Sequence, residues 1–266
     1  MSESLLAFVF GLLIGSFLNV CIYRWPRDLS VVRPRSHCVA CGKTIAWFDN
    51  VPVLSYLVLG GRCRNCGSRI SWRYPLVEVI TAAAFFAAVQ EFGFTFAALK
   101  TCLFAAISVA LIFTDLEERI LPDELTLGGT VAGLLFSAFV PMPPGIAQLF
   151  FTGRAGSLLE SVLGALVPPL VLWFAGWLYE RIRHREGLGL GDVKMVAMIG
   201  SFLGLSGALL TLAAGSLLGS VIGSAFILVF RQNPATYKLP YGTFIGVAGL
   251  VIGLTARQVL GWYAEL

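Results

Sequence analysis

The sequence predicts an all-α integral membrane protein with about eight transmembrane helices and one large polar loop. Composition is the first reason: of the 266 residues, 57% are hydrophobic and 13% are charged, whereas soluble domains average about 45–50% apolar and about 25% charged residues. The mean hydropathy of +0.83 agrees. Length is the second reason, because a helix needs about 20 mostly apolar residues to cross a bilayer, and such runs recur along the chain.

Eight apolar segments reach or approach that length. They are 5–23, 76–92, 96–114, 125–141, 158–180, 192–204, 206–230 and 239–260. The sixth segment is short, which indicates a tilted helix or a water-filled region beside it.

The basic residues predict how these helices are oriented. If the N-terminus lies outside, 16 of the 19 Lys and Arg residues fall in or beside loops that face the cytoplasm. Those loops are 24–75, 115–124, 181–191 and 231–238. Because an excess of Lys and Arg marks the cytoplasmic side, the net charge of +4 indicates anionic lipid head groups as neighbours and not nucleic acid.

The largest cytoplasmic loop contains CVACG and CRNCG, with 21 residues between Cys41 and Cys63. Two C-x-x-C pairs can place four thiolates around a tetrahedral metal ion, so Cys38, Cys41, Cys63 and Cys66 predict a cytoplasmic zinc-binding loop. Four thiolates leave no open coordination position, so the zinc would be structural. An iron–sulfur cluster and unmetallated thiols stay open as alternatives, whereas disulfides do not fit a reducing compartment.

The remaining cysteines and the two histidines offer little for catalysis. Cys21 and Cys102 lie in apolar segments, where cysteine acts as a small apolar filler. His37 and His184 lie in polar loops as ordinary surface residues. A Ser-His-Asp or Cys-His enzyme is therefore disfavoured.

Two acidic residues border apolar helices, where ionisable groups are costly and usually functional. Asp115 closes the run TCLFAAISVALIFTD, and Asp192 follows the glycine-rich segment GLGLG. Gly189 and Gly191 allow a backbone or a bound peptide to approach Asp192, and Lys194 comes two residues later. An aspartate before a helix is also a standard N-cap, and that interpretation of Asp192 stays open.

The predicted topology relates these two aspartates. The helix ending at Asp115 runs inward and the helix beginning at Asp192 runs outward, so both lie at the cytoplasmic edge although they are 77 positions apart. Like charges cannot both ionise cheaply at contact distance, so a close pair shares one proton. The ionised carboxylate can then take a proton from water while the protonated one polarises an amide carbonyl.

Glu78 is a third acid near the end of an apolar segment, in RYPLVEVITA. It can extend to the interface, pair with Arg73 or pair with a neighbouring helix, and a functional role stays open beside these.

Two other classes of protein compete with a hydrolase. A secondary transporter could use Asp115 and Asp192 to relay ions, because paired membrane acids also do this. Transporters usually carry inverted repeats and midplane sites, and the sequence shows no repeat. A zinc-stabilised assembly protein without chemistry would tolerate the loss of either aspartate.

Several strings together resemble the bacterial type IV prepilin leader peptidases, which are membrane aspartyl proteases with a Gly-x-Gly-Asp motif. The strings are GSFLNVCIYRWP, the two cysteine pairs with DNVPVLSYLVLGGRC in the segment that separates them, RYPLVEVITA, FTDLEERILPDELTL and EGLGLGDVKMVAMIG. The resemblance runs from about Gly15 to Gly200, with a weaker match at LPYGTFIG. There the family often has proline where this chain has Thr243, which leaves the role of that segment open.

The resemblance implies a function and a location. Members of this family cleave short basic leaders from prepilins and pseudopilins after a glycine, on the cytoplasmic face of the bacterial inner membrane. Their catalytic aspartates correspond to Asp115 and Asp192, and their zinc ligands to the four loop cysteines. Many members also methylate the new N-terminus with S-adenosylmethionine. The expected division is an N-terminal region, 1–95, with the zinc loop and an association with methyl transfer, and a peptidase region, 96–266.

No Rossmann-type glycine pattern marks a site for S-adenosylmethionine. Five aromatic residues in and beside the loop could hold an adenine or a peptide, although such residues more often anchor a protein at the membrane interface. They are Trp47, Phe48, Tyr56, Trp72 and Tyr74.

Overall fold

The computed structural model describes residues 1–142, 145, 151, 153–184, 187–231 and 239–264, with side chains up to residue 255, and all named elements in this part of the chain are helices. The all-α prediction is confirmed. Contacts divide the chain into two units, Met1–Ala110 and Leu111–Leu266. The division of function near residue 95 stays a prediction.

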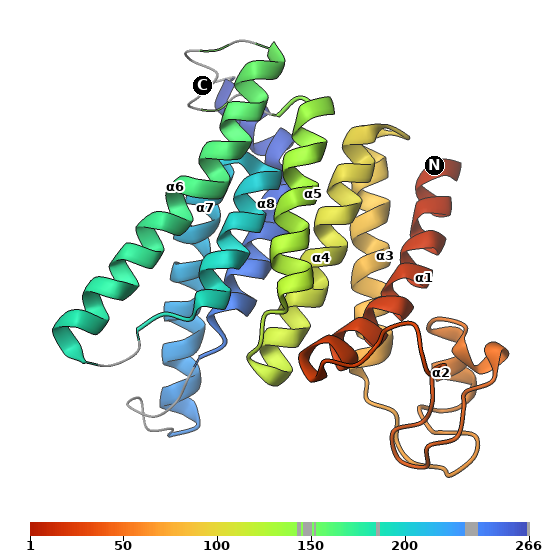
Figure 1. The fold of residues 1–266 in the computed structure, drawn as a ribbon. Coiled ribbons are helices and arrows are strands. Elements are labelled where there is room, and N and C mark those ends of the chain that lie inside the picture. The colour runs from red at the N-terminus through yellow and green to blue at the C-terminus, as the bar shows by residue number, and fades with distance from the viewer. Residues whose placement is uncertain (143–144, 146–150, 152, 185–186, 232–238, 265–266) are drawn as a thin grey trace. The chain divides into compact units, whose positions relative to one another are not determined.

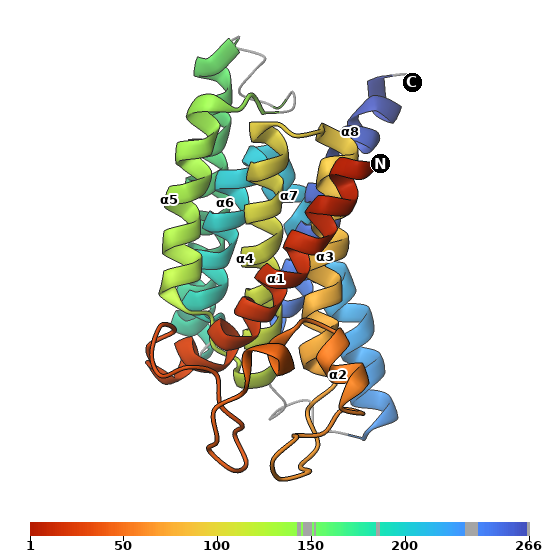
Figure 2. The ribbon, with the colours of Figure 1, turned by 90° about the vertical axis from the view of Figure 1, so that its right-hand side faces the viewer.

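The N-terminal unit is built on two helices that pack through glycine. Its elements are α1 (Ser2–Arg24), η1 (Trp25–Arg27), η2 (Trp47–Asn50), α2 (Leu54–Val58), α3 (Arg73–Phe92) and most of α4 (Phe96–Glu118). α1 and α3 lie side by side in two views (Figures 1 and 2). A Cβ on Gly11 or Gly15 would lie 2.6 Å from a Cα of α3, so these two glycines let the helix backbones approach closely.

The polar loop leaves α1 and returns to α3 at the same end of this helix pair (Figures 1 and 2). It holds the short helix α2, which the sequence did not predict, and two isolated antiparallel bridges, His37 with Thr44 and Arg62 with Arg69. The side chain of Arg24 donates to the carbonyl oxygens of Ser30 and Pro34, both at 2.8 Å, and so holds the start of the loop against the end of α1.

The C-terminal unit contains four long helices and the last turns of α4. They are α5 (Asp123–Phe139), α6 (Gly153–Arg183), α7 (Leu190–Val229) and α8 (Tyr241–Ala264). A Cβ on Gly164 of α6 would lie 2.5 Å from the carbonyl carbon of Gly204 in α7, and a Cβ on Gly215 of α7 would lie 2.9 Å from the Cα of Ile245 in α8. Small residues therefore set the close packing of this unit as well.

Helix α7 has a break at Gly204, whose φ of 76° and ψ of −177° are not helical. The break separates the predicted segments 192–204 and 206–230, which are both helical as expected. The Oε1 atom of Glu160, on α6, accepts hydrogen bonds from the backbone N–H (3.2 Å) and the hydroxyl (3.3 Å) of Ser206. This buried carboxyl thus satisfies a backbone group that the broken helix leaves free.

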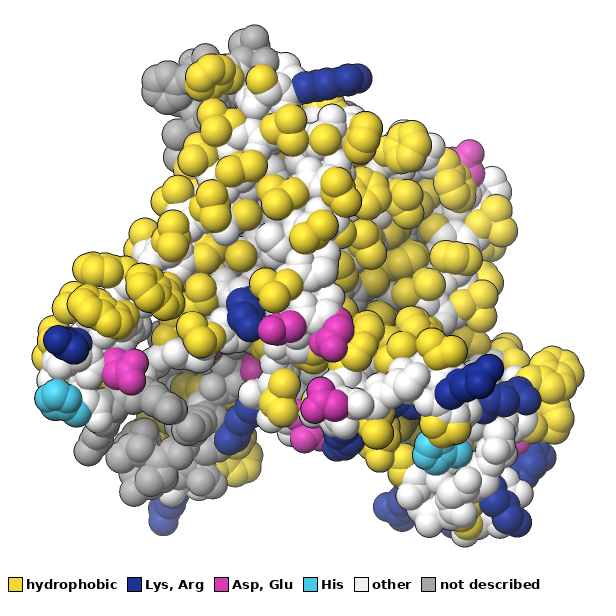
Figure 3. All heavy atoms as spheres, viewed as in Figure 1, with side chains coloured by type: hydrophobic (Ala, Val, Ile, Leu, Met, Phe, Trp, Pro, Cys, Tyr) yellow, Lys and Arg dark blue, Asp and Glu magenta, His cyan; other side chains and the backbone are white. Residues whose placement is uncertain are grey.

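Five helices of the described chain are long and apolar enough to cross a membrane. They are Ser2–Arg27, which joins α1 and η1, and α3, α4, α6 and α7. α5 is shorter, with 17 residues, and the apolar part of α8 whose side chains are described is Tyr241–Thr255. In Figure 3, apolar side chains cover the faces of α5 and α6 that are in view. The chain is a multi-pass membrane protein, as predicted.

Candidate active site and metal centre

Asp115 lies one turn before the end of α4 and is only 5% exposed. Its Oδ2 atom accepts a hydrogen bond from the backbone N–H of Thr243 at 2.6 Å and another from the Thr243 hydroxyl at 2.8 Å. The hydroxyl also lies 3.3 Å from the carbonyl oxygen of Ile112. Burying a carboxyl without hydrogen-bond partners would cost free energy, and the two Thr243 donors offset that cost.

Two glycines of α8 allow its first turns to reach α4. A Cβ on Gly242 would lie 3.1 Å from the Cγ atom of Asp115, and a Cβ on Gly246 would lie 2.5 Å from Ile112 and 2.8 Å from Met195. A side chain at either position would force its neighbours or α8 to shift, so the two glycines of YGTFIG help Thr243 to reach the carboxyl.

Asp192 lies in the first turn of α7, but it is not the N-cap, which is Gly189. Asp192 is the third residue of the helix, and its N–H donates to the carbonyl oxygen of Gly189 at 3.1 Å. A Cβ on Gly189 would lie 3.4 Å from the Asp192 Oδ2 atom. The N-cap interpretation of Asp192 is therefore wrong, although a carboxylate in a first helical turn still benefits from the helix dipole.

The C-terminal unit brings the two aspartates together. The charge of Asp115 acts on the carboxyl of Asp192. Leu121 lies against both neighbourhoods, because a Cβ on Gly191 would be 3.2 Å from its Cβ and a Cβ on Gly242 would be 3.1 Å from its Cδ1. The segment between α4 and α5 thus packs between the start of α7 and the start of α8, beside both acids.

Lys194 points to a different acid. Its Nζ atom lies 2.7 Å and 2.9 Å from the two carboxylate oxygens of Asp123, the first residue of α5. The side chains are 35% and 56% exposed, so this ion pair joins the starts of α5 and α7 at the surface.

The four loop cysteines form one cluster in the N-terminal unit, with sulfur atoms that all lie within 4.8 Å of one another. The Sγ atoms of Cys38 and Cys66 are 3.9 Å apart, close to the roughly 3.8 Å expected between two sulfurs on a tetrahedral zinc with Zn–S bonds of about 2.3 Å. The cluster could hold a metal ion, as predicted.

Each cysteine pair folds into the same local turn. The N–H groups of Cys38 and Gly42 donate to the carbonyls of Lys43 and Cys38, and those of Cys63 and Gly67 donate in the same way to Ser68 and Cys63. Both glycines have a φ of 70°, which glycine adopts without strain.

The turn backbone also prepares sulfur to bind metal. The N–H of Cys41 makes the largest contribution to lowering the pKa of Cys38 to about 6, and the Ser68 hydroxyl lowers the pKa of Cys66. Metal binding requires the thiolate, so both effects favour a bound ion. Without a metal ion the four thiols do not ionise together, because the neighbouring Cys38 and Cys66 help to raise the pKa of Cys41 to about 11.

Family models match both parts of the chain. The model described as the bacterial peptidase A24 N-terminal domain matches residues 9–92, and the model described as the type IV leader peptidase family matches residues 102–224. The chain is also 34% identical to a protein named prepilin leader peptidase/N-methyltransferase from Aeromonas hydrophila, over 97% of this chain and 92% of that protein. The chain belongs to the type IV leader peptidase family.

Other relatives carry the same name. The chain is 40% identical over 233 residues to the one from Myxococcus xanthus, which covers 86% of this chain and 65% of that protein, so it spans less than two thirds of that relative. It is 32% identical to the one from Pseudomonas aeruginosa, over 96% of this chain and 91% of that protein. No solved structure matches the chain significantly.

In this leader peptidase family member, Glu78 anchors the loop. Its carboxyl is 7% exposed, accepts the N–H of Val53 at 2.8 Å and hydrogen-bonds the Ser16 hydroxyl on α1. Val53 has a φ of 60°, which a β-branched residue rarely adopts. Glu78 therefore satisfies the backbone of a strained turn, and its partners are the loop and α1.

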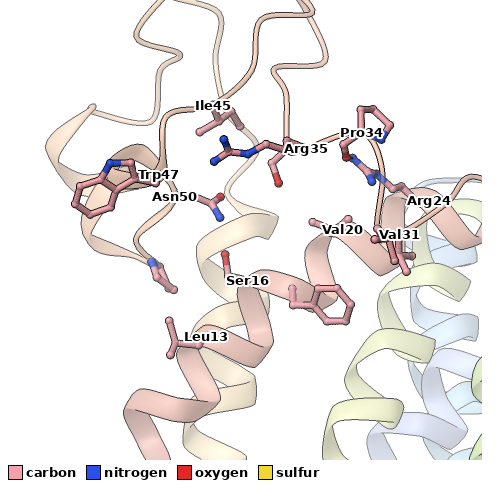
Figure 4. A pocket seen from close by; sticks show the side chains of 14 residues that line it. Leu13, Ser16, Val20, Arg24, Val31, Pro34, Arg35, Ile45, Trp47 and Asn50 are labelled. Carbon is pink, nitrogen blue, oxygen red and sulfur yellow. The ribbon is translucent and has the colours of Figure 1, made fainter.

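A cavity of about 390 Å³ lies between the second half of α1 and the loop in the N-terminal unit. Figure 4 shows Ser16 on one side, Asn50 and the Arg35 side chain on the other, and Trp47 at the edge. Cavities of roughly 300–1,000 Å³ hold small organic ligands. Sequence analysis did not locate this cavity, because residues far apart in the chain line it.

The sequence did not predict the roles of two polar residues that the fold uses, Thr243 and Glu160. Thr243 is marked in the sequence only by its departure from the family pattern. Glu160 is an acid inside the apolar segment 158–180 and is 2% exposed. The cost of burying an acid was the signal that could have found it.

Proposed function

We propose that the protein is a membrane aspartyl peptidase that removes leader peptides from prepilins and pseudopilins. The observation that carries the proposal is the buried carboxyl of Asp115, which lies on the same side of the C-terminal unit as Asp192, because Leu121 packs against glycines beside both acids. The names of the relatives supply the class of substrate. This type of hydrolysis needs two carboxyls within reach of the same scissile amide. A single buried aspartate would not support it.

The chemistry follows from one proton shared by two carboxyls. The ionised carboxylate takes a proton from water while the water oxygen forms a bond to the scissile carbonyl carbon. The protonated carboxyl gives its proton to the carbonyl oxygen. When the C–N bond breaks, the first carboxyl passes its proton to the leaving nitrogen and the second recovers one from the diol.

The segment around Asp192 supports a peptide substrate. Gly189 presents backbone without a side chain beside the acid, since a Cβ there would lie 3.4 Å from the Asp192 Oδ2 atom, so an extended leader can approach it. Gly191 packs against Leu121 instead. Lys194 acts indirectly, because its ion pair with Asp123 braces the start of α7.

The orientation follows from charge. With the N-terminus outside, the basic loops and both aspartates face the cytoplasm of a bacterial inner membrane. Leaders that keep their basic residues in the cytoplasm would then meet the aspartates on the correct side.

The four cysteines are proposed to bind one structural zinc ion. Four thiolates at tetrahedral spacing complete its coordination, so the metal would stabilise the loop and take no part in hydrolysis.

Methylation of the new N-terminus is proposed as a second activity, on the names of the relatives. S-adenosylmethionine would supply the methyl group. The cavity is the proposed site for this donor, because Arg35 offers a cation for its carboxylate, Trp47 an aromatic face for adenine, and Asn50 and Ser16 polar groups for the rest. Equilibrium binding of S-adenosylmethionine should weaken in Arg35→Ala and Asn50→Ala while leader cleavage is kept. Unchanged binding in both variants would exclude the cavity.

The test of function is an assay of purified protein with a prepilin, with and without S-adenosylmethionine, read by mass spectrometry. A product of the cleaved mass reports the peptidase activity. A further increase of about 14 Da, the mass that one methyl group adds in place of hydrogen, reports the methyltransferase activity. Absence of cleavage, together with ion transport in vesicles, would favour the transporter.

A further inference from the structure

We propose that Thr243 is a positioning residue of the peptidase site. Its two hydrogen bonds to Asp115 make Asp115 the carboxylate that takes the proton from water, and they leave Asp192 to carry the shared proton. The inference rests on the proposed peptidase function and adds to it the roles of the two acids.

The hydrogen bonds at Asp115 indicate an ionised carboxylate. Both Thr243 donors act on one oxygen, Oδ2, at 2.6 Å and 2.8 Å. The 2.6 Å bond from the backbone N–H is shorter than the usual N–H···O range of about 2.7–3.2 Å, and shortening of this kind is typical of an ionised acceptor. The 2.8 Å hydroxyl bond has an ordinary length. Because Oδ2 is occupied twice, Oδ1 is the oxygen that remains to accept a proton from water.

The backbone donor strengthens this assignment. Thr243 is the third residue of α8, and an N–H in the first turn of a helix has no acceptor within its own helix. The first turn also carries the positive end of the helix dipole, which favours a negative charge beside it. An N–H can only donate, so it always meets Asp115 as an acceptor.

The opposite arrangement, with the shared proton on Asp115, agrees less well with the distances. A protonated Asp115 would donate to the Thr243 hydroxyl, which would then have to donate to the carbonyl oxygen of Ile112 at 3.3 Å. That distance exceeds the usual range for O–H···O bonds, about 2.5–3.0 Å. The 2.8 Å bond to Asp115 is therefore the preferred use of the single hydroxyl proton.

The packing of α8 keeps Thr243 in place. Ile245 is fully buried, and its Cα lies 2.9 Å from the Cβ position of Gly215 on α7. Gly246 rests on Ile112 of α4 and Met195 of α7. Contacts with two helices fix the position of the start of α8 and therefore of the Thr243 donors. The Asp115 carboxyl is thus oriented before substrate binds.

Within the part of the chain that the structure describes, no side chain donates to Asp192 in the way that Thr243 donates to Asp115. The Asp192 carboxyl is oriented by the backbone of Gly189, the N-cap of the same helix. The charge of Asp115 also acts on this carboxyl. Of two carboxyls that share one proton, the one with fewer donors is the better place for it. Asp192 is therefore the acid that protonates the scissile carbonyl oxygen.

The assignment applies to chains that have a donor at this position. Proline, which the family often has here, has neither an N–H nor a hydroxyl. Such members must hold the corresponding aspartate by other groups.

Kinetics of Thr243→Val and Thr243→Ser test the positioning role. Loss of one hydrogen bond to a charged group should lower kcat in Thr243→Val by about ten- to a hundredfold, with KM changed by no more than about twofold because the substrate does not touch Thr243. Thr243→Ser keeps the hydroxyl and should restore most of kcat. Thr243→Ala, which is smaller, should behave as Thr243→Val if the latter does not fold.

The matched control is Tyr241→Phe. It removes another hydroxyl from the first turn of α8, one that hydrogen-bonds Ser216 at 2.8 Å and not Asp115, and kcat should stay near the wild-type value. A wild-type kcat in Thr243→Val, or a Thr243→Ser variant as slow as Thr243→Val, would overturn the proposal. Wild-type protein that cleaves no prepilin would instead reject the peptidase function itself, so the two failures are distinct.

Infrared difference spectra test where the proton resides. The spectrum of the wild type minus that of Asp192→Asn should contain a protonated-carboxyl band at neutral pH, because Asp115 stays ionised on its two donors. If that band is absent, the proton does not reside on Asp192 and the assignment of roles is wrong.

Discussion

The cysteine cluster and the aspartate pair are built in opposite ways. Each half of the cluster is a turn of about six residues with its own hydrogen bonds and its own glycine at φ 70°, and the two halves repeat the same design. The aspartates come from helices 77 positions apart, and each depends on glycines of other helices or loops for access. Local sequence determines the first site, whereas helix packing determines the second.

The comparison also explains what each site tolerates. A turn that satisfies its own backbone can be lost without moving a helix. The Asp115 carboxyl depends on α8 reaching α4, so any change that shifts α8 alters it. We therefore expect damage at the cluster to stay local and damage at the aspartates to abolish function.

The largest expected effect is on the aspartate pair. Asp115→Asn or Asp192→Asn should lower leader cleavage by at least about a thousandfold, because neither amide can replace a carboxyl that transfers protons. Both variants should still insert in the membrane and bind metal at the cysteines. Quantified cleavage of a prepilin in detergent or vesicles measures this.

The control for that experiment is the nearby exposed acid Glu117. Glu117→Gln should cleave at close to the wild-type rate. Normal processing by either aspartate variant would reject the pair.

The second effect, on the cluster, sharpens the contrast. Cys38→Ser should release zinc and loosen the loop, because three thiolates bind the ion less well than four, while cleavage persists. Metal analysis and limited proteolysis of the loop measure the two changes. Cys102→Ser, a buried cysteine of α4, is the matched control and should keep its metal. Wild-type protein that contains no zinc when purified without chelator would contradict the assignment.

A smaller effect is expected at Glu78, which joins the loop to the helices. Glu78→Ala should leave the N–H of Val53 without a partner, at a cost of about 1–3 kcal/mol, and so expose the turn 51–54 to protease. Glu78→Gln keeps an acceptor oxygen and should protect the turn. Equal protease sensitivity of Glu78→Ala and the wild type would show that other contacts hold the loop.

The smallest effects are expected at the two surface ion pairs, one beside each site. Arg64 donates to both carboxylate oxygens of Asp49, at 2.7 Å and 2.8 Å, and lowers the pKa of that acid, and Lys194 pairs with Asp123. Exposed pairs contribute little to stability, so Asp49→Asn should keep its metal and Asp123→Asn should keep most of its kcat. A large loss in either variant would show that its pair supports the neighbouring site.

The sequence by itself determined the membrane class, the helical segments and the four-cysteine cluster. Apolar runs of fixed length predict helices, and the spacing of Cys38, Cys41, Cys63 and Cys66 predicts a cluster, because both patterns are local. It also selected Asp115 and Asp192, from the cost of placing charge beside lipid.

Only the tertiary structure decided how those acids are held. The N-cap of α7 is Gly189 and not Asp192, and the donor to Asp115 comes from Thr243, 128 positions away. Glycines at helix contacts allow the helices that carry these residues to pack closely. In a sequence that is apolar throughout, no hydrophobic pattern indicates which glycines make such contacts. Which helices meet depends on packing between distant segments, and that information is spread over the whole chain.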